Sequence, residues 1–554
     1  MSAYFNFKMH SAVPIDPLKD RHRDVGRYAF AASAALVILV AVMPRAYHLG
    51  QRSLWLDEAI AANISRGTLA QTLILTRALH SAPIIHPFIL CAVEKAAVSA
   101  VSVRLPSLIA SLLAVILMLW MAASRLVDRE IGVLAALMLS VSASQVRYAQ
   151  EVREYSLSVL YATVLLYAFL LLAAKRRDRG RLAFFCLVLL IAPLIQYGLV
   201  LASAAALISL LLLGLLNGDI AAVIEEVLIS SLFLGLGSLA SFLLTLRFQW
   251  GEKAWYLQGD FPAAGSSIIH FVVSNTRRIL SFLLPGRAIA LIAVVAIGFL
   301  AWRQVKRRQV GPLEIAGATS VLVVLACALL RVYPFGPIRQ CLFLAPGVCM
   351  LAAAGLIEVK NACGRRARII VFVALVGVIV GSGALQIRSE RPYAEIEDVQ
   401  SVLSALRSRI APTDQAYVYS GAVPAVDFYT QGRDTRLVYG DFHRESPTGY
   451  LQEIQADVGP ATPRLWIIFS HVFGSEDQTI LHDLASDWRI EPIISAKGAA
   501  LYEAVRRRST EGKIASAADA GVLEAIPSPS VPSLQPKNDS FRDWSLRNAG
   551  RPVQ

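Results

Sequence analysis

The sequence has few cysteines and few charged residues for its length. Only six of its 554 residues are Cys, and none of them forms a CxxC pair. All six lie in or beside apolar stretches, so we interpret them as buried apolar side chains, not as a disulfide framework or a metal site. Charged residues make up 17% of the chain, hydrophobic residues make up 56%, and the mean hydropathy is +0.55. These values exclude a soluble globular protein and indicate a polytopic membrane protein.

Internal repeats, Walker motifs and dinucleotide-binding glycine motifs are also absent from the sequence. The formal net charge of +13 does not indicate a nucleic-acid partner, because the basic residues are concentrated in three short segments between apolar stretches, at 175–181, 303–308 and 360–368. Such clusters are typical of the cytoplasmic loops of membrane proteins. The charge therefore predicts topology, with the lipid bilayer as the partner.

The apolar stretches predict a bundle of about eleven transmembrane helices, since ~20 apolar residues cross a bilayer. They lie near 28–46, 103–124, 131–147, 155–174, 182–196, 199–216, 223–245, 286–302, 313–332, 338–357 and 369–387. The basic segment 1–27 is too long and polar for a cleavable signal peptide and is predicted to be cytoplasmic. The odd number of spans then places all three basic clusters inside and the region after 388 outside. We expect the inner membrane of a bacterium, with the active site on the periplasmic side.

Two stretches are too interrupted by polar residues to be lipid-exposed spans. Residues 82–100 contain two Pro, a His, a Glu and a Lys, and residues 266–284 contain a His and two Arg. We interpret both as interfacial helices in external loops, the first within a long loop at 47–102. The predicted transmembrane domain as a whole covers 28–390.

Beyond the last span the pattern changes to short apolar runs that alternate with helical segments. Residues 391–506 predict a small extracytoplasmic α/β domain with a largely parallel sheet. The predicted strands are Gln415–Ser420, Arg436–Tyr439, Arg464–Phe469, Arg489–Ile494 and Ala499–Val505, and the predicted helices are Glu395–Arg409, Thr448–Val458 and Asp477–Trp488. Residues 507–554 are rich in Ser, Pro, Lys and Asp, and we predict that they are disordered.

Asp57 and Glu58 follow the first predicted span, and Trp55 lies two residues before Asp57. Placing two adjacent acidic side chains beside a bilayer costs free energy unless they face water or take part in the function of the protein. A carboxylate at the membrane surface can take a proton from a hydroxyl nucleophile. A merely solvated loop is the alternative interpretation.

Two further external loops carry polar residues that could complete a site. The candidates are Arg147, Tyr148, Glu151, Arg153 and Tyr155 in one loop and Tyr333 and Arg339 in the other. One guanidinium group can bind two phosphate oxygens at once, so these arginines suit a phosphate at the outer interface. The alternatives are snorkelling arginines and tyrosines of an interfacial belt.

Three histidines on the predicted outer side, His80, His86 and His270, could ligate a metal ion. Their spacing matches no standard zinc pattern. A divalent metal therefore stays open as a cofactor, with His86 and His270 as the weak candidates, and no other cofactor is predicted.

Four short motifs occur in order in the first third of the chain: L-W-L-D-E-A around Asp57, H-P-F-I-L from His86, V-R-L-P-S at Val103–Ser107 and Y-A-Q-E-V-R-E-Y-S at Tyr148–Ser156. Together they resemble the GT-C membrane glycosyltransferases of family 39. That family includes protein O-mannosyltransferases, lipid A aminoarabinose transferases and bacterial enzymes that attach mannose or galacturonic acid to envelope glycans. The resemblance covers about residues 28–390.

The resemblance implies a catalytic base at Asp57, with Glu58 beside it, and a sugar donor linked to polyprenyl phosphate. It also implies phosphate binding at the position of His86, where the aminoarabinose transferases have a Lys. A histidine would be a weaker and pH-dependent substitute. The family commonly has a double proline after this position, whereas this chain has Pro87-Phe88 and so departs from the family pattern next to His86.

The leading hypothesis is therefore an inverting transferase of hexosyl or uronosyl groups to a hydroxyl of an envelope glycan, lipid A or a protein. The alternative is a transporter or flippase for a lipid-linked sugar. A transporter would be expected to have charges near the middle of its spans and paired halves, and this sequence has neither. A scaffold role would leave the acids of the first loop unexplained.

Overall fold

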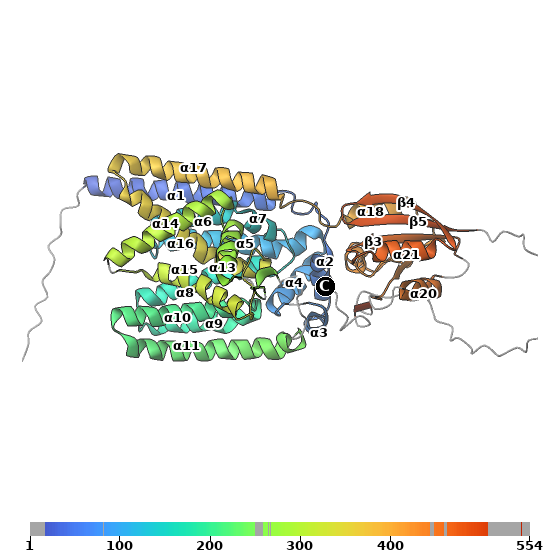
Figure 1. The fold of residues 1–554 in the computed structure, drawn as a ribbon, viewed down its shortest axis with the longest axis horizontal. Coiled ribbons are helices and arrows are strands. Elements are labelled where there is room, and N and C mark those ends of the chain that lie inside the picture. Colours follow the sequence, from blue (N-terminus) through green and yellow to red (C-terminus); the bar gives the residue numbers. More distant parts are fainter. Residues whose placement is uncertain are drawn as a thin grey trace, which may run out of the picture.

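A computed structural model shows a helical bundle with a small α/β domain at one end (Figure 1). The residues that it describes are 17–80, 82–249, 259–263, 265, 267–307, 309–443, 448–458, 462–507 and 544–545. Most of the predicted N-terminal segment 1–27 lies outside these residues. Helix α1, Pro17–Ala46, begins well before the predicted start of the first span.

The long helices of the bundle run roughly side by side along the length of the molecule (Figure 1). They are α1, α5 (Ala100–Ala123), α6 (Arg129–Val141), α8 (Tyr155–Ala174), α9 (Arg179–Ile195), α10 (Leu199–Asn217), α11 (Ile220–Ser241), α14 (Gly286–Arg307), α15 (Pro312–Leu329), α16 (Ala345–Ala362) and α17 (Arg365–Glu390). Among the described residues, nine helices are long and apolar enough to cross a membrane. Helices α6 and α9 occupy the other two predicted positions but have only 13 and 17 residues. The polytopic helical fold is thus confirmed, but the count of eleven spans is not.

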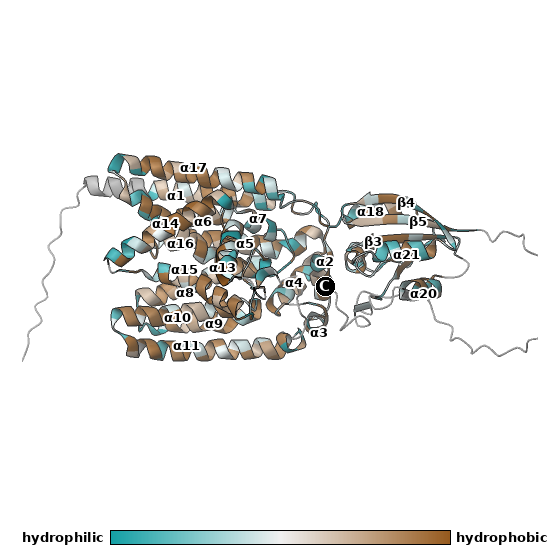
Figure 2. Cartoon of the chain, viewed as in Figure 1, coloured by the Kyte–Doolittle hydropathy of each residue, from teal (hydrophilic) through white to brown (hydrophobic). Residues whose placement is uncertain are grey.

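The centre of the bundle is α16, which packs against α14, α6, α15 and α8. In its span 83% of the residues are buried, against 17% in the span that contains α11 at the periphery. Small residues allow this close packing: a Cβ atom on Gly355 of α16 would lie 2.7 Å from the backbone of Ala296 in α14. The ribbon of the peripheral helix α11 is coloured mainly as hydrophobic in Figure 2, and many of its large apolar side chains are exposed, among them Leu228 and Leu232.

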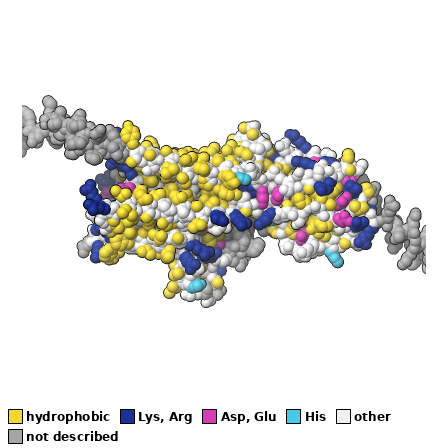
Figure 3. All heavy atoms as spheres, turned by 90° about the horizontal axis from the view of Figure 1, so that it is seen from above, with side chains coloured by type: hydrophobic (Ala, Val, Ile, Leu, Met, Phe, Trp, Pro, Cys, Tyr) yellow, Lys and Arg dark blue, Asp and Glu magenta, His cyan; other side chains and the backbone are white. Residues whose placement is uncertain are grey.

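Basic side chains gather at the end of the bundle that lies away from the α/β domain (Figure 3). Ion pairs connect neighbouring segments at this end, among them Arg176 with Glu226 at 3.3 Å and Arg303 with Glu358 at 2.9 Å. The three basic clusters of the sequence therefore share one end of the bundle, as the predicted topology requires.

Three short helices, α2 (Leu56–Ser65), α3 (Leu69–Leu79) and α4 (Ile85–Ala96), follow the first span and lie between the bundle and the α/β domain (Figure 1). Helix α4 corresponds to the first predicted interfacial helix, and α13 (Ile268–Leu283) to the second. Ser99 begins α5 with a capping box in which it pairs with Ser102. This cap ends the external segment and starts the second span.

The α/β domain contains a five-stranded sheet with the order β2-β1-β3-β5-β4. Its strands are β1 (Gln415–Val418), β2 (Leu437–Tyr439), β3 (Arg464–Ser470), β4 (Trp488–Ala496) and β5 (Ala499–Arg506). Strand β1 is parallel to β2 and β3, whereas β5 is antiparallel to β3 and β4. The prediction of a largely parallel sheet was wrong for this half, because only two residues separate β4 from β5 and so short a connection forms a hairpin.

Four helices accompany the sheet: α18 (Val399–Arg407), α19 (Val423–Thr430), α20 (Thr448–Asp457) and α21 (Glu476–Leu484). Helix α19 was not predicted. It contacts α2, and one apolar cluster contains residues of both, such as Ile60 and Val426. The predicted disordered tail lies outside the described residues except for Arg507, Trp544 and Ser545. Trp544 is buried and donates a hydrogen bond to the carbonyl oxygen of Gly440 at 2.8 Å, so the prediction of disorder was wrong at this point.

Candidate active site

Asp57 lies in the first turn of α2 and is only 3% exposed. The preceding residue is tied to the α/β domain, since the backbone N–H of Leu56 donates a hydrogen bond to the carboxylate of Glu397 at 3.0 Å. His471 lies 2.5 Å from the other oxygen of Glu397. The α/β domain therefore helps to fix the start of the helix that carries the predicted base.

Two arginines from different loops surround the carboxylate of Asp57. Oδ2 of Asp57 accepts a hydrogen bond from Nη1 of Arg339 at 2.6 Å and lies 3.7 Å from Nη1 of Arg153. Burial by itself would raise the pKa of Asp57, but Arg339 and Arg153 outweigh it and hold the pKa below its usual value. Asp57 is therefore ionised at neutral pH.

Glu58 points to a different set of partners and is fully buried. Its two oxygens accept hydrogen bonds from Nε and Nη2 of Arg104 at 3.0 and 2.8 Å, and one of them also accepts from the backbone N–H of Val152 at 3.0 Å. Burial would raise the pKa of Glu58, but Arg104 and Arg52 lower it overall. This carboxylate joins the first external loop to α5 and to the loop before α8, an arrangement that suits an orienting residue.

Arg339 begins the 3-10 turn Arg339–Leu344 that leads into α16, and two aromatic rings lie beside it. The rings of Trp55 and Tyr155 each have their centroids 5.6 Å from its guanidinium carbon. Aromatic faces attract a guanidinium group and keep it in place while its N–H groups point elsewhere. All three predicted loops thus meet at the pair of Asp57 and Arg339.

Arg147 and Glu151 form a separate pair within the second loop, with Nε of Arg147 donating to Glu151 at 3.0 Å. The side chain of Arg147 is 42% exposed, whereas that of Arg153 is only 3% exposed. The rings of Tyr148 and Tyr155 pack edge to face, with their centroids 5.5 Å apart. Of the two arginines in this loop, Arg153 is therefore the one that contacts Asp57.

A small cavity of about 100 Å³ opens beside these groups. It is lined by Pro83, Arg153, Glu154, Tyr155, Gln196, Tyr197, Gly198, Tyr333, Arg339 and Gln340. Tyr333 is held there by a hydrogen bond from its hydroxyl to the carbonyl oxygen of Gln340 at 2.9 Å. Two guanidinium groups at the wall of a buried cavity create a place for an anionic group such as a phosphate.

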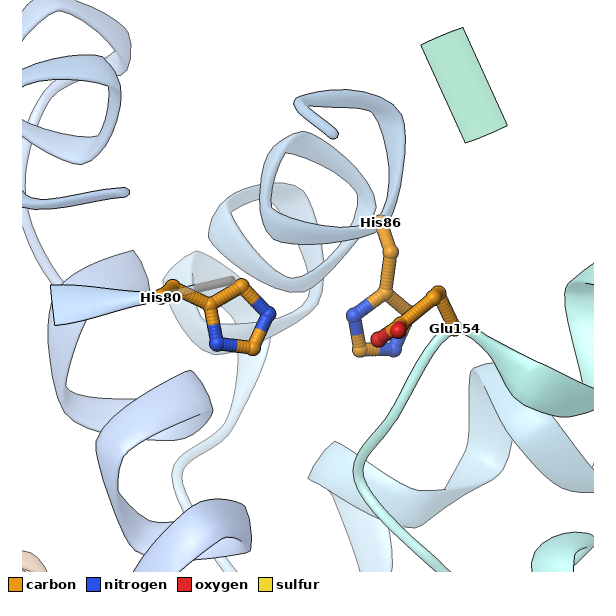
Figure 4. Close-up of side chains that lie close together, drawn as sticks. All are labelled: His80, His86 and Glu154. Atoms are coloured by element: carbon orange, nitrogen blue, oxygen red, sulfur yellow. The ribbon is translucent and has the colours of Figure 1, made fainter. Parts of the chain in front are cut away.

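His86 and His80 lie near this cavity, together with Glu154 (Figure 4). All three side chains are buried. Burial and the nearby Arg153 lower the pKa of His86 to about 3, so its ring is neutral at physiological pH. His270, the other predicted metal candidate, lies elsewhere on α13 and is exposed. The structure does not bring His86 and His270 together.

A second and much larger cavity, of about 1150 Å³, lies between α13, the start of α14 and the end of α17. Its lining includes His270 and three arginines, Arg277, Arg278 and Arg287. Pro337, two residues before Arg339, also lines it. The cavity therefore reaches close to the site around Asp57.

Several residues that shape the site were not predicted from the sequence. Arg104, Arg52 and Glu397 fix the acidic loop, and Glu154 and Gln196 line the small cavity. Arg104 could have been recognised from the sequence, because an arginine inside a predicted span needs a partner. The role of Glu397 could not be recognised from the sequence, because Glu397 lies about 340 residues after Leu56 in another domain.

Comparison with known proteins gives structural relatives only. No family model and no curated protein sequence matches the chain. ArnT from Cupriavidus metallidurans bound to undecaprenyl phosphate superposes with a TM-score of 0.53 at 14% identity, over 86% of this chain and 97% of that one. Its apo state gives a TM-score of 0.54 at 14% identity, over 87% and 98%. The Archaeoglobus fulgidus oligosaccharyltransferase complex with Zn and sulfate gives 0.51 at 10% identity, over 78% and 67%.

The superposition with ArnT covers 86% of this chain, a larger share than residues 28–390 of the bundle make up. The chain therefore has the GT-C fold of polytopic membrane glycosyltransferases, as the motifs of the sequence predict.

Proposed function

We propose that the protein is an inverting glycosyltransferase that moves a sugar from a polyprenyl phosphate to an acceptor hydroxyl at the outer face of the bacterial inner membrane. The observation that carries the proposal is the contact between Asp57 and Arg339, which places a buried base next to a phosphate-binding group. The GT-C fold and the undecaprenyl phosphate bound to the related ArnT structure support it.

In the proposed reaction Asp57 accepts the proton of the acceptor hydroxyl, whose oxygen attacks the anomeric carbon of the donor. The bond between this carbon and the phosphate oxygen breaks, and the polyprenyl phosphate leaves with the electron pair. Because the leaving group is anionic, Arg339 and Arg153 stabilise it by charge and by hydrogen bonds without a general acid. Glu58 orients the loop.

The pairing of Asp57 with Arg339 has a consequence for the order of events. In the absence of donor, Arg339 lowers the pKa of Asp57 and so makes it a weak base. A donor phosphate that binds Arg339 competes with Asp57 for the same N–H group. The pKa of Asp57 then rises, because it loses part of the stabilisation by Arg339, and Asp57 becomes a stronger base. Donor binding thus activates the base.

The large cavity between α13 and α17 favours an anionic acceptor. Arg277 and Arg287 are both exposed to it. Basic groups at the mouth of a site attract phosphates or carboxylates. This feature supports an acceptor such as lipid A or an acidic glycan over a neutral protein hydroxyl.

A transporter or flippase of lipid-linked sugars is the competing function. Within the described spans, the buried arginines lie near the span ends, such as Arg45 in 27–46 and Arg104 in 100–123. Charges near the bilayer midplane are expected for transport. The distribution therefore favours the enzyme. The proposed orientation places residues after 400 outside, which a periplasm-specific reporter fused there would verify.

The decisive experiment measures sugar transfer by the purified Asp57→Asn variant. Mass spectrometry of envelope glycans from a deletion strain first identifies the sugar and the acceptor. We then expect a loss of transfer of at least about a hundredfold, because Asn cannot accept the proton. Donor binding should be retained or tightened, since Asn competes less for Arg339. Near-normal transfer by Asp57→Asn would refute the role of Asp57, and the transport function would then be favoured.

A further inference from the structure

We propose that His80, His86 and Glu154 form a binding site for a divalent transition-metal ion, of which Zn²⁺ fits best, beside the small cavity that Arg153 and Arg339 line. One nitrogen from each histidine and one oxygen of Glu154 lie within 4.8 Å of one another, and all three residues are buried. Figure 4 shows the two rings facing each other with the carboxylate of Glu154 beside His86. The inference rests on the proposed function only for the role of the metal, not for its binding.

The three ligands come from separate elements that the fold brings together. His80 is the C-cap residue of α3 and His86 lies in the first turn of α4, so the ends of two successive helices bring the two rings together. Glu154 precedes α8 in the second external loop. A sequence spacing of six residues followed by 68 matches no zinc motif, which explains why the pattern could not be found from the sequence.

A second observation points to a ligand at this place. Both ring nitrogens of His86, Nε2 of His80 and Oε2 of Glu154 are buried without a hydrogen-bond partner among the described residues. Leaving such a buried polar atom without a partner is unfavourable, because the atom has lost its hydrogen bonds to water. Oε2 of Glu154 lies 3.3 Å from Nε of Arg153 but accepts no hydrogen bond from it. A bound cation would satisfy three of these groups together.

The chemistry of the three ligand side chains determines which metal ion fits the site. Two neutral imidazoles and one carboxylate are a frequent set for zinc sites that keep an open fourth position. Tetrahedral zinc needs ligand atoms roughly 3.3 Å apart, which follows from bonds of ~2.0–2.2 Å, so small side-chain rotations would close the site. Mg²⁺ and Ca²⁺ prefer oxygen ligands and would bind poorly.

The surrounding charges permit a cation and give it a role. Arg153 and Arg339 are positive, but Asp57 and Glu154 balance them. A divalent ion therefore adds net positive charge next to the small cavity, which Glu154 also lines. Its open position can take an oxygen of the donor phosphate opposite the two arginines. Phosphate should in turn tighten metal binding, because the coupling between two ligands is reciprocal.

The test measures zinc on the purified full-length chain without any substrate. After dialysis against Zn²⁺ we expect about one equivalent per chain by elemental mass spectrometry, and a rise of the melting temperature that Mg²⁺ does not produce. His80→Ala, His86→Gln and Glu154→Gln should each weaken Zn²⁺ binding by at least about tenfold. His482→Ala, which removes an exposed histidine on α21, is the matched control and should bind zinc normally.

A folded wild-type chain that takes up no zinc, or three variants that bind it as the wild type does, would overturn the site. The melting temperature of each variant is measured without and with zinc. A misfolded variant has no normal melting transition even without zinc, whereas a folded variant that has lost the site melts normally and is not stabilised by zinc. A failure of inorganic phosphate to tighten zinc binding would overturn the phosphate role. A chain that binds zinc but transfers no sugar would support the site and refute the proposed function, so the two failures are distinguishable.

Discussion

Glu58 and Arg104 form a two-point ion pair, with distances of 3.0 and 2.8 Å, in which the side chains are 0% and 1% exposed. The guanidinium group of Arg104 also donates to the backbone oxygens of Leu49, Arg52 and Ser53. A single arginine of the second span thus holds the backbone of the loop that leads to Asp57. The geometry of the predicted base depends on a pair that does not itself touch the small cavity.

Glu58→Gln should therefore destabilise the protein more than it impairs the chemical step. The change leaves Arg104 and Arg52 buried beside an uncharged group, and breaking a buried ion pair in this way costs ~3–5 kcal/mol. We expect a clearly lower melting temperature in detergent. Asp219→Asn is the control, because its pair with Arg177 is exposed and is worth at most ~1 kcal/mol. Equal melting temperatures for the two variants would contradict this structural role.

Arg339→Lys keeps the positive charge but loses the planar fork that binds two oxygens at once. We expect weaker binding of a polyprenyl phosphate and at least about tenfold slower transfer, with normal membrane insertion. The pKa of Asp57 should stay below its usual value, since a cation remains nearby. Arg147→Lys is the matched control, because Arg147 pairs with Glu151 and does not contact Asp57. If Arg339→Lys and Arg339→Ala both turn over normally, Arg339 is not part of the site.

The meeting of the three external loops could be expected from the sequence, because acids, arginines and tyrosines cluster there beside predicted spans. The sequence could not show that Glu154, and not Glu151, is the acid that meets His80 and His86, since both lie in the same short segment. Nor could it show the contact of Glu397 with Leu56. Such long-range contacts depend on how the α/β domain docks, and hydrophobic periodicity carries no information about that.

The burial of Glu94 on α4 leads to the prediction that the stability of the folded protein depends on pH. Both of its carboxylate oxygens are buried without a hydrogen-bond partner among the described residues. Burial raises its pKa to about 8, although Arg66 opposes the effect. The folded state then keeps a proton that the unfolded state releases above about pH 4.3. Stability should therefore fall as the pH rises from about 4.3 to 8, since the unfolded chain binds fewer protons.

Glu94→Gln should remove this pH dependence, because an amide resembles the protonated acid and does not titrate. We expect the melting temperature of Glu94→Gln to exceed that of the wild type by at least about 2 °C at pH 8 and to match it near pH 4. Glu491→Gln is the control, because its side chain is 53% exposed, and it should change neither value. A wild-type melting temperature that is flat between pH 5 and 8 would show that Glu94 is solvated in solution.

The arginines of the large cavity lead to a prediction about the acceptor. Arg277→Glu combined with Arg287→Glu reverses two charges that face the cavity, and it touches neither Asp57 nor Arg339. For an anionic acceptor we expect its KM to rise at least about fivefold, since partly exposed ion pairs contribute ~0.2–1 kcal/mol each. Binding of polyprenyl phosphate, and kcat at saturating acceptor, should stay near the wild-type values. The effect should shrink at high salt, because exposed charges are screened.

Arg388→Glu is the matched control for this charge reversal, because Arg388 is exposed at the same end of α17 but does not line the cavity. It should leave the KM of the acceptor unchanged at every salt concentration. An unchanged KM in the double variant would mean that the acceptor enters elsewhere, and a fall in donor binding would instead assign the cavity to the lipid-linked donor. The comparison of the two variants at low and high salt therefore separates local recognition by the cavity from the general field of this basic protein.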